Sequence, residues 1–142
     1  MSTVKQLLRR KSSTVYSVTP DTTVFDALTF MAQKEIGAVV VLENHKLVGT
    51  MSERDYARKI ILKGKSSKET FVHEIMMDSL LIVSPETSVQ ECMSLMTDTR
   101  MRHLPVVVNY DVVGLISIGD VVKYIMEEQE FMIKELERYI TT

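Results

Sequence analysis

Apolar and polar positions follow the same order twice along the chain, and this order predicts the secondary structure of each copy. A short apolar run, Val15–Val18, ends just before Pro20, and its counterpart, Leu80–Val83, ends just before Pro85. Because a proline disfavours helix at the residue before it, each run is expected to be a short extended strand. Behind each proline, apolar side chains recur at the helical spacing i, i+3, i+4, i+7. These two stripes are Val24, Ala27, Leu28 and Met31, then Val89, Cys92, Met93 and Met96.

A signal for the start of a helix precedes each stripe. Thr23 stands before the first stripe with Asp26 three residues later, and Ser88 and Glu91 take the same places before the second. A hydroxyl followed three residues on by a carboxylate is the pattern of a capping box. We therefore expect both helices to begin directly after these hydroxyl residues.

Two short apolar runs around a polar turn follow each helix. In the first copy, Val39–Leu42 and Leu47–Met51 flank a turn that contains Asn44. The second copy repeats the pattern around Asn109, with Pro105 in its first run, which indicates an edge or an irregular start. Such paired runs predict a β-hairpin. Apolar residues at helical spacing come next in each copy: Tyr56, Ala57, Ile60 and Ile61, then Val121, Val122, Ile125 and Met126.

The two copies align without a gap, residues 15–61 with residues 80–126, and a short amphipathic helix precedes each of them. Two copies of one unit are expected to cover each other's apolar surfaces. The sequence therefore predicts an α+β protein of two tandem units, each β-α-β-β-α, packed as a pseudo-two-fold pair. The expected domains are residues 1–66 with an N-terminal leading helix, residues 67–126 with a linker helix, and a helical extension over residues 127–142. The leading helices carry Val4, Leu7 and Leu8, then Val72, Ile75 and Met76.

Each hairpin leads into a Gly-x-x-Ser-x-x-Asp motif, whose local interpretation is a helix cap with Ser at the N-cap and Asp three residues on. Capping does not explain the glycine, which indicates a backbone conformation or a close approach that a Cβ would block. The start of a helix also attracts anions, and an Asp beside it can accept hydrogen bonds from ribose hydroxyls. A nucleotide site and a simple cap both stay open on these residues alone. The motif residues are Gly49, Ser52 and Asp55, then Gly114, Ser117 and Asp120.

Two β-α-β-β-α units that each carry this motif resemble a tandem pair of cystathionine-β-synthase-type (CBS) domains, a Bateman module. The segment from Arg102 to Val107 is similar to the family's His-x-Pro-Val-type strand, and Ser52–Asp55 is similar to its Ser-x-Arg-Asp variant. The resemblance extends over most of the chain. It implies a sensor that binds an adenine nucleotide in the clefts between repeats: AMP first, with ADP, ATP, NAD(H) or S-adenosylmethionine as further candidates.

The resemblance also implies roles for individual residues. Asp55 and Asp120 would hold ribose hydroxyls, and Ser52 and Ser117 would contact ribose or phosphate. Thr50 and Leu115, with Val18 and Val83, would line the base, while Arg54, Arg102 and His103 are candidate phosphate groups. The copies differ here, because Gly119 stands opposite Arg54, and Gly37 and Ala38 stand opposite Arg102 and His103. Each of these three side chains could instead be solvated, and a cleft without a cation would favour a nucleoside or stay empty.

Composition narrows the classes of function. The net charge of −2 gives no indication of nucleic-acid binding, and no apolar run is long enough to predict a membrane span. The first residues lack the apolar core of a secretory signal, so we expect a cytoplasmic protein. The single cysteine, Cys92, lies on a helical stripe and is expected to be structural. The three histidines share no metal-ligand spacing and no catalytic arrangement is visible, so we expect no metal and no enzymatic activity.

The last helix continues beyond the second repeat with a coiled-coil-like stripe that only Gln129 interrupts. An apolar stripe left in water marks an interface, so we expect a homodimer. The alternative is that the stripe folds back onto the N-terminal helix, within one chain or across a dimer. The stripe consists of Val122, Ile125, Met132, Leu136 and Tyr139.

The sequence thus favours a non-enzymatic regulatory module that binds an adenine nucleotide and acts on a separate effector protein. The alternative is a structural, dimerising scaffold in which the motifs only cap helices. Binding of a nucleotide separates the two.

Overall fold

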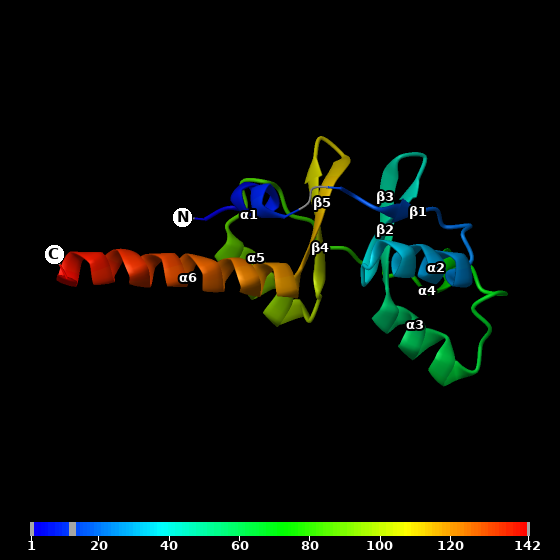
Figure 1. Cartoon of the computed structure of the whole chain (residues 1–142). Helices are drawn as coiled ribbons and strands as arrows, with labels where there is room; N and C mark the ends of the chain where they lie inside the picture. Colours follow the sequence, from blue (N-terminus) through cyan, green and yellow to red (C-terminus); the bar gives the residue numbers. More distant parts are fainter. Residues whose placement is uncertain (1, 12–13, 142) are drawn as a thin grey trace.

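The computed structural model describes residues 2–11 and 14–141 and shows two α+β units side by side, with one long helix reaching away from the second (Figure 1). Element order follows the prediction except at Leu80–Val83, where the described chain forms no strand. The helices are α1 (Val4–Arg10), α2 (Val24–Lys34), α3 (Glu53–Lys59), α4 (Val72–Ile75), α5 (Val89–Thr99) and α6 (Ile118–Thr141), with a 3-10 turn, η1, over Ile61–Lys63. The strands are β1 (Ser17–Val18), β2 (Ala38–Glu43), β3 (Lys46–Ser52), β4 (His103–Val108) and β5 (Asp111–Ser117).

Both predicted hairpins are present, β2–β3 and β4–β5, and both are antiparallel. Asn44 and His45 at the first turn have φ of 52° and 66°, and Asn109 and Tyr110 at the second have 49° and 70°. Two successive positive φ angles give the turn twist that suits a two-residue hairpin, and asparagine tolerates this conformation well.

The two sheets differ because of one proline. In the first unit β1 pairs in parallel with β2, and Val40 N–H donates to the Tyr16 carbonyl over 3.3 Å. Pro105 takes the place of Val40 in β4 and has no N–H to donate. The expected strand at Leu80–Val83 is therefore reduced to a single bridge between Val83 and Val106, and the second sheet has two strands.

The predicted helix starts are confirmed. The Thr23 hydroxyl accepts from the Asp26 N–H over 3.1 Å at the start of α2, and the Ser88 hydroxyl accepts from the Glu91 N–H over 3.0 Å at the start of α5. Each helix then places its apolar stripe in a core, with Met31 and Met96 both nearly inaccessible.

The leading helices are exchanged between the two units. Helix α1 packs into the core of the second unit, and the Val4 N–H donates to the Thr87 carbonyl over 2.8 Å. Helix α4 packs into the core of the first unit, where the Val72 N–H donates to the Thr22 carbonyl over 2.8 Å. Each unit along the chain therefore completes its core with a helix from outside its own repeat. The domain boundaries at residues 66 and 126 stay a prediction.

The helices that follow the motifs bury different faces from those predicted. In α6 the buried residues are Val121 and Tyr124, whereas Val122 and Met126 are exposed. The start of α6 lies against α1 as well as its own sheet, and this second neighbour shifts the buried face toward Tyr124. After the first motif, Ile60 is buried as expected, but Ala57 and Ile61 are exposed. Helix α3 ends at Lys59, so Ile61 falls in η1 and leaves the helical stripe.

Candidate functional site: two clefts between the repeats

Both motifs cap their helices. The Ser52 N–H donates to Asp55 Oδ2 over 2.9 Å, and the Asp55 N–H donates to the Ser52 hydroxyl over 3.2 Å. The Ser117 N–H and the Asp120 N–H make the same reciprocal pair, over 2.8 and 3.0 Å. The capping interpretation is thus confirmed. The caps use Oδ2 of Asp55 and of Asp120, so the other oxygen of each carboxylate, Oδ1, makes no cap bond.

The motif glycines are explained by close approach. A Cβ on Gly49 would lie 2.7 Å from Met76 Sδ and 2.9 Å from the Met77 carbonyl oxygen. A Cβ on Gly114 would lie 2.9 Å from Leu8 Cδ2. Met76 and Leu8 occupy matching places in the two leading segments, so each glycine makes room for the exchanged helix. Each glycine thus allows the motif strand to pack closely against a leading segment.

The first cleft, of about 370 Å³, lies between the first motif and the segment that leads into β4 of the second unit. The first unit provides the motif residues and much of α3, and Met77 closes one side. Its lining residues are Gly37, Ala38, Thr50, Ser52, Arg54, Asp55, Arg58, Lys59, Met77, Arg100, Met101, Arg102 and His103.

The second cleft, of about 340 Å³, is the counterpart of the first. Here the second motif faces the segment that leads into β2, and residues just after α1 complete the wall. Its lining residues are Lys11, Thr14, Val15, Tyr16, Glu35, Ile36, Gly37, Ala38, His103, Leu115, Ser117 and Asp120.

The first cleft is strongly cationic. Asp55 is the one acidic residue among its described lining residues, against the five cations Arg54, Arg58, Lys59, Arg100 and Arg102. Burial, together with the neighbouring charges of Arg102 and Arg58, lowers the pKa of Arg54 from its usual value. Guanidinium groups stay charged at neutral pH and bind phosphate oxygens in a bidentate manner. This wall of the cleft is suited to a phosphorylated ligand.

Asp55 lies at the base of this cationic wall and is largely buried. Lys59 Nζ is 3.5 Å from Asp55 Oδ1, but its hydrogen bond goes to the Ile75 carbonyl over 2.8 Å. The ammonium is therefore held mainly by α4 rather than by the carboxylate. Such a carboxylate beside a helix start is chemically suited to accept hydrogen bonds from a pair of ribose hydroxyls.

The second cleft has a different charge. Glu35 replaces Arg100, and Lys11 makes an ion pair with Asp120, its Nζ 2.5 Å from Oδ2. Burial raises the pKa of Asp120, but the hydrogen bonds from Lys11 and from Ser117 outweigh it and hold the pKa below its usual value. Asp120 is therefore ionised and already paired at neutral pH.

His103 lines both clefts. Burial, followed by the charge of Lys11, lowers the pKa of its imidazole below the usual 6.5. The neutral ring can still donate one hydrogen bond to a phosphate, but it adds no positive charge at neutral pH.

The structure brings most of the predicted residues together. Thr50, Ser52, Arg54, Asp55, Arg102 and His103 line the first cleft, and Leu115, Ser117 and Asp120 line the second with His103. Val18 and Val83 lie at the cores instead: Val83 is 5% exposed within the second core, and Val18 packs against the first. Neither valine lines a cleft, so their contact with a base stays a prediction.

Sequence reasoning missed four cations at the clefts. Arg58 follows Arg54 by four residues and Lys59 follows Asp55 by four, so helical spacing alone could have placed both on the cleft side of α3. Arg100 ends α5 at a left-handed position with φ of 59°. Lys11 had no such signal, because it reaches the second motif only through the exchange of α1.

Other classes of site find little support in the described part of the chain. Residues 2–11 and 14–141 contain no cluster of His, Cys, Asp or Glu that could hold a metal ion. No described helix combines the length and the apolar character needed to cross a membrane. Cys92 is fully buried, and its burial, with the charge of Glu91, raises its pKa to about 11, as expected of a structural thiol.

Comparison with known proteins identifies the family. The family model for the CBS domain matches residues 4–62 and 72–127. The chain is 46% identical over 127 residues to the mitochondrial CBS domain-containing protein CBSX3 of Arabidopsis thaliana, covering 86% of this chain and 62% of that protein's length. It also resembles the structure of a protein with CBS domains from Burkholderia ambifaria, with 47% identity, a TM-score of 0.86, and coverage of 90% of this chain and 96% of that one.

A further solved relative carries a ligand. CBSX2, solved in complex with AMP, is 26% identical with a TM-score of 0.71, and the match covers 91% of this chain and 99% of that one. The segments that the family model matches coincide with the two repeats of the fold, and each contains one of the two motifs. The chain therefore belongs to the CBS domain family and contains two CBS units in tandem.

Proposed function

We propose that the chain is a non-enzymatic regulatory module that binds an adenine nucleotide in the first cleft. The observation that carries this proposal is the cationic wall beside Asp55, where Arg54, Arg100 and Arg102 from two different units converge on one motif. A nucleotide requires a group that can bind its ribose hydroxyls, such as this carboxylate, next to cations that can bind its phosphate. The AMP complex of CBSX2 supports the choice of ligand class.

The charge of the first cleft also orders the candidate ligands. AMP, ADP, ATP and NAD(H) all carry phosphates that the arginines can bind. S-adenosylmethionine carries a positive sulfonium, which the five cations would repel. AMP remains the first candidate, and S-adenosylmethionine becomes the weakest.

Regulation then requires a change of shape or of affinity for another protein. The first cleft is built from both units, so a ligand there would contact α3 of one and the segment before β4 of the other. We propose that ligand binding fixes the two units relative to each other and that a separate effector protein recognises the resulting conformation. A cytoplasmic location belongs to the same proposal.

The competing function is a dimerising scaffold without a ligand. One observation favours it: the Ser and Asp of both motifs are already engaged in helix capping. The exposed apolar stripe on α6 would then be the functional surface. Ligand binding decides between the two functions.

The test is titration calorimetry with AMP, ADP, ATP, NAD and S-adenosylmethionine, on the wild-type chain and on Asp55→Ala. We expect Asp55→Ala to weaken AMP binding by about 1.5–3 kcal/mol, the range for hydrogen bonds to a charged group. The conservative variant Asp55→Asn keeps a capping acceptor and should fold like the wild type while still losing affinity. Asp98→Ala, which removes an exposed carboxylate from α5, is the matched control.

Thermal melts of each variant show whether the fold is intact. A wild-type chain that binds none of the five ligands would contradict the proposed function and leave the scaffold. Unchanged AMP affinity in Asp55→Ala would show that the ligand does not use this motif.

A further inference from the structure

Lys11 occupies the second cleft from within the chain. Its Nζ donates to Asp120 Oδ2 over 2.5 Å and to the Leu115 carbonyl oxygen over 2.6 Å. Both acceptors belong to the second motif, and Asp120 is the residue that would receive the ribose hydroxyls. Of the described residues that line this cleft, only Lys11 carries a positive charge at neutral pH.

The backbone of Lys11 is fixed by α1. Lys11 is the C-cap residue of this helix, and its N–H donates to the Leu7 carbonyl over 3.2 Å. Leu7 is 2% exposed within the second core, which anchors the helix. The last turn of α1 therefore positions the Lys11 side chain beside the second motif.

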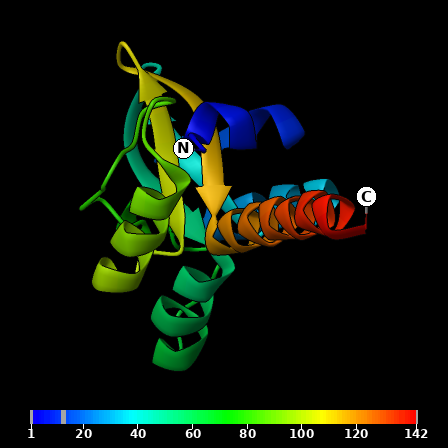
Figure 2. The same cartoon turned by 90° about the vertical axis from the view of Figure 1, so that its left-hand side faces the viewer.

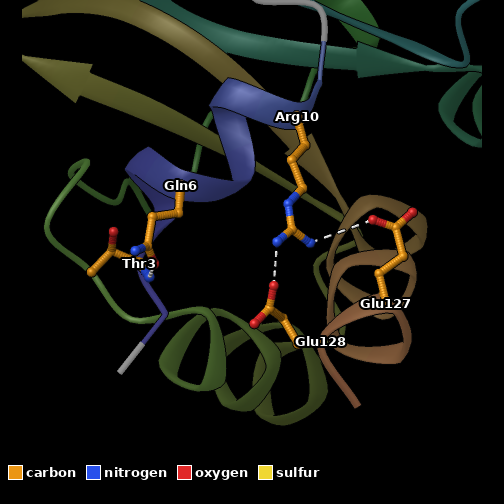
Figure 3. A network of polar contacts seen from close by, with 5 residues as sticks. All are labelled: Thr3, Gln6, Arg10, Glu127 and Glu128. Carbon is orange, nitrogen blue, oxygen red and sulfur yellow. Dashed lines mark hydrogen bonds and ion pairs between the residues drawn. The ribbon is translucent and has the colours of Figure 1, made fainter. Parts of the chain in front are cut away.

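Arg10 ties the same end of α1 to α6. Its guanidinium forms ion pairs with Glu127 and Glu128 (Figure 3) and lies 4.5 Å from the centre of the Tyr124 ring. Views from two sides show α1 beside the second sheet, on the side from which α6 extends (Figures 1 and 2), and α1 contacts α6. Each of these partly exposed contacts contributes little stability alone. Together they limit movement of the end of α1 that carries Lys11.

The first cleft lacks this arrangement. Ser79 takes the place of Lys11 in the other leading segment, and it is exposed. The Thr50 carbonyl, which corresponds to that of Leu115, accepts from the Met77 backbone N–H over 2.8 Å instead. Lys59 approaches Asp55 only to 3.5 Å. A lysine is therefore near the carboxylate in both clefts, but only in the second cleft does its ammonium hydrogen-bond to the motif, through Asp120 Oδ2 and the Leu115 carbonyl.

We propose that Lys11 is a specificity-determining residue that blocks the second cleft, so that the chain binds a ribonucleoside in the first cleft alone. The inference rests on the proposed function, because it assumes that the motif carboxylates receive ribose hydroxyls. Lys11 lines the second cleft and binds two acceptors of its motif, so a ligand that used these acceptors would have to displace the ammonium. Its neutral hydroxyls would then replace a charged partner of Asp120, which makes the exchange unfavourable.

The experiment measures how many adenosine molecules each chain binds, by equilibrium dialysis at saturating ligand. Adenosine is the probe because it lacks phosphate, so the result does not depend on the cations of the first cleft. Lys11→Met removes the ammonium and keeps an unbranched side chain. Lys11→Gln, a second variant, keeps a polar group should the apolar one disturb folding. Lys5→Met, at an exposed position of the same helix, is the matched control for loss of one charge.

We expect one adenosine per chain for the wild type and Lys5→Met, and two for both Lys11 variants. Adding Asp120→Ala to Lys11→Met should return the number to one, whereas adding Asp55→Ala should leave the new site occupied. Two sites in the wild type, or no gain in the Lys11 variants, would overturn the blocking role and leave the proposed function intact. No site in the wild type together with one in Lys11→Met would support the blocking role and contradict the assignment of the first cleft.

Discussion

The two clefts are built by the same backbone and differ in the side chains that face them. In the first, Arg54, Arg100 and Arg102 stand around the motif, and in the second the same places hold Gly119, Glu35 and Gly37. The caps are alike in both, and each motif glycine lies close to a leading segment. The residues that cap the helices and allow close packing are thus the same in both units. The residues that only face the cleft differ, which makes one cleft cationic and leaves the other bonded to Lys11.

The helices that follow the motifs differ even more. Helix α3 ends at Lys59, whereas α6 runs on to Thr141 and extends well beyond its own unit (Figure 1). The alternative of folding back onto α1 is met only at the start of α6, through Arg10 and Tyr124. Beyond Glu128, six large apolar residues of α6 are each more than half exposed. They are Phe131, Met132, Ile133, Leu136, Tyr139 and Ile140.

The largest expected effect concerns this extension, which we propose joins two copies of the chain. Leu136→Asp places a charge in the middle of the apolar stripe and should weaken self-association about a thousandfold, which corresponds to roughly 4 kcal/mol. Truncation after Met126 should do the same, but it also removes the partners of Arg10 and should lower thermal stability. Sedimentation at micromolar concentration measures the effect.

The matched control for the extension is Lys134→Asp, which changes the charge of the same helix at an exposed polar position. It should leave self-association unchanged. A full-length chain that sediments as a monomer would contradict the proposed dimer, whatever the variants do.

The sequence predicted what depends on neighbours along the chain. Both hairpin turns followed from asparagine and its surroundings, and both helix starts followed from Thr23 and Ser88, because caps and turns are local. For the motif glycines the sequence left a special backbone conformation and a close approach both open; the structure shows the close approach, whose partner was not predicted. That partner, Met76 or Leu8, comes from the exchange of the leading helices, which no local pattern encodes. The role of Lys11 was missed for the same reason, since the exchange joins it to Asp120 across most of the chain.

The two glycines provide a second, intermediate comparison. In Gly49→Ala the new methyl group meets the Met77 carbonyl, a backbone atom that cannot move aside, as well as Met76. We expect this variant to lose about 1–3 kcal/mol of unfolding free energy, the usual cost of overpacking. In Gly114→Ala the methyl group meets only the end of the flexible Leu8 side chain, so the loss should be smaller. Urea unfolding compares the two.

Gly37→Ala is the control for both glycine variants, because its nearest neighbour, Glu53 Oε1, would lie at an ordinary 3.7 Å. It should unfold close to the wild-type midpoint. Equal losses in Gly49→Ala and Gly114→Ala would show that the Met77 backbone yields as readily as a side chain, and would remove this difference between the units.

The smallest expected effect concerns His103, which belongs to both clefts while its counterpart is Ala38. Burial, with the charge of Lys11, lowers the pKa of His103 in the folded chain below 6.5. As pH falls through 6.5, the unfolded chain binds a proton that the folded chain does not, so the unfolding free energy must decrease. The decrease continues until the pH reaches the folded pKa.

His103→Gln should lack this part of the pH dependence, so the difference in unfolding free energy between wild type and variant should change between about pH 7.5 and 5.5. Urea unfolding of both proteins across this range measures it, with His45→Asn at the exposed hairpin turn as the control. Parallel curves for wild type and His103→Gln would show that the imidazole is not buried between the two units.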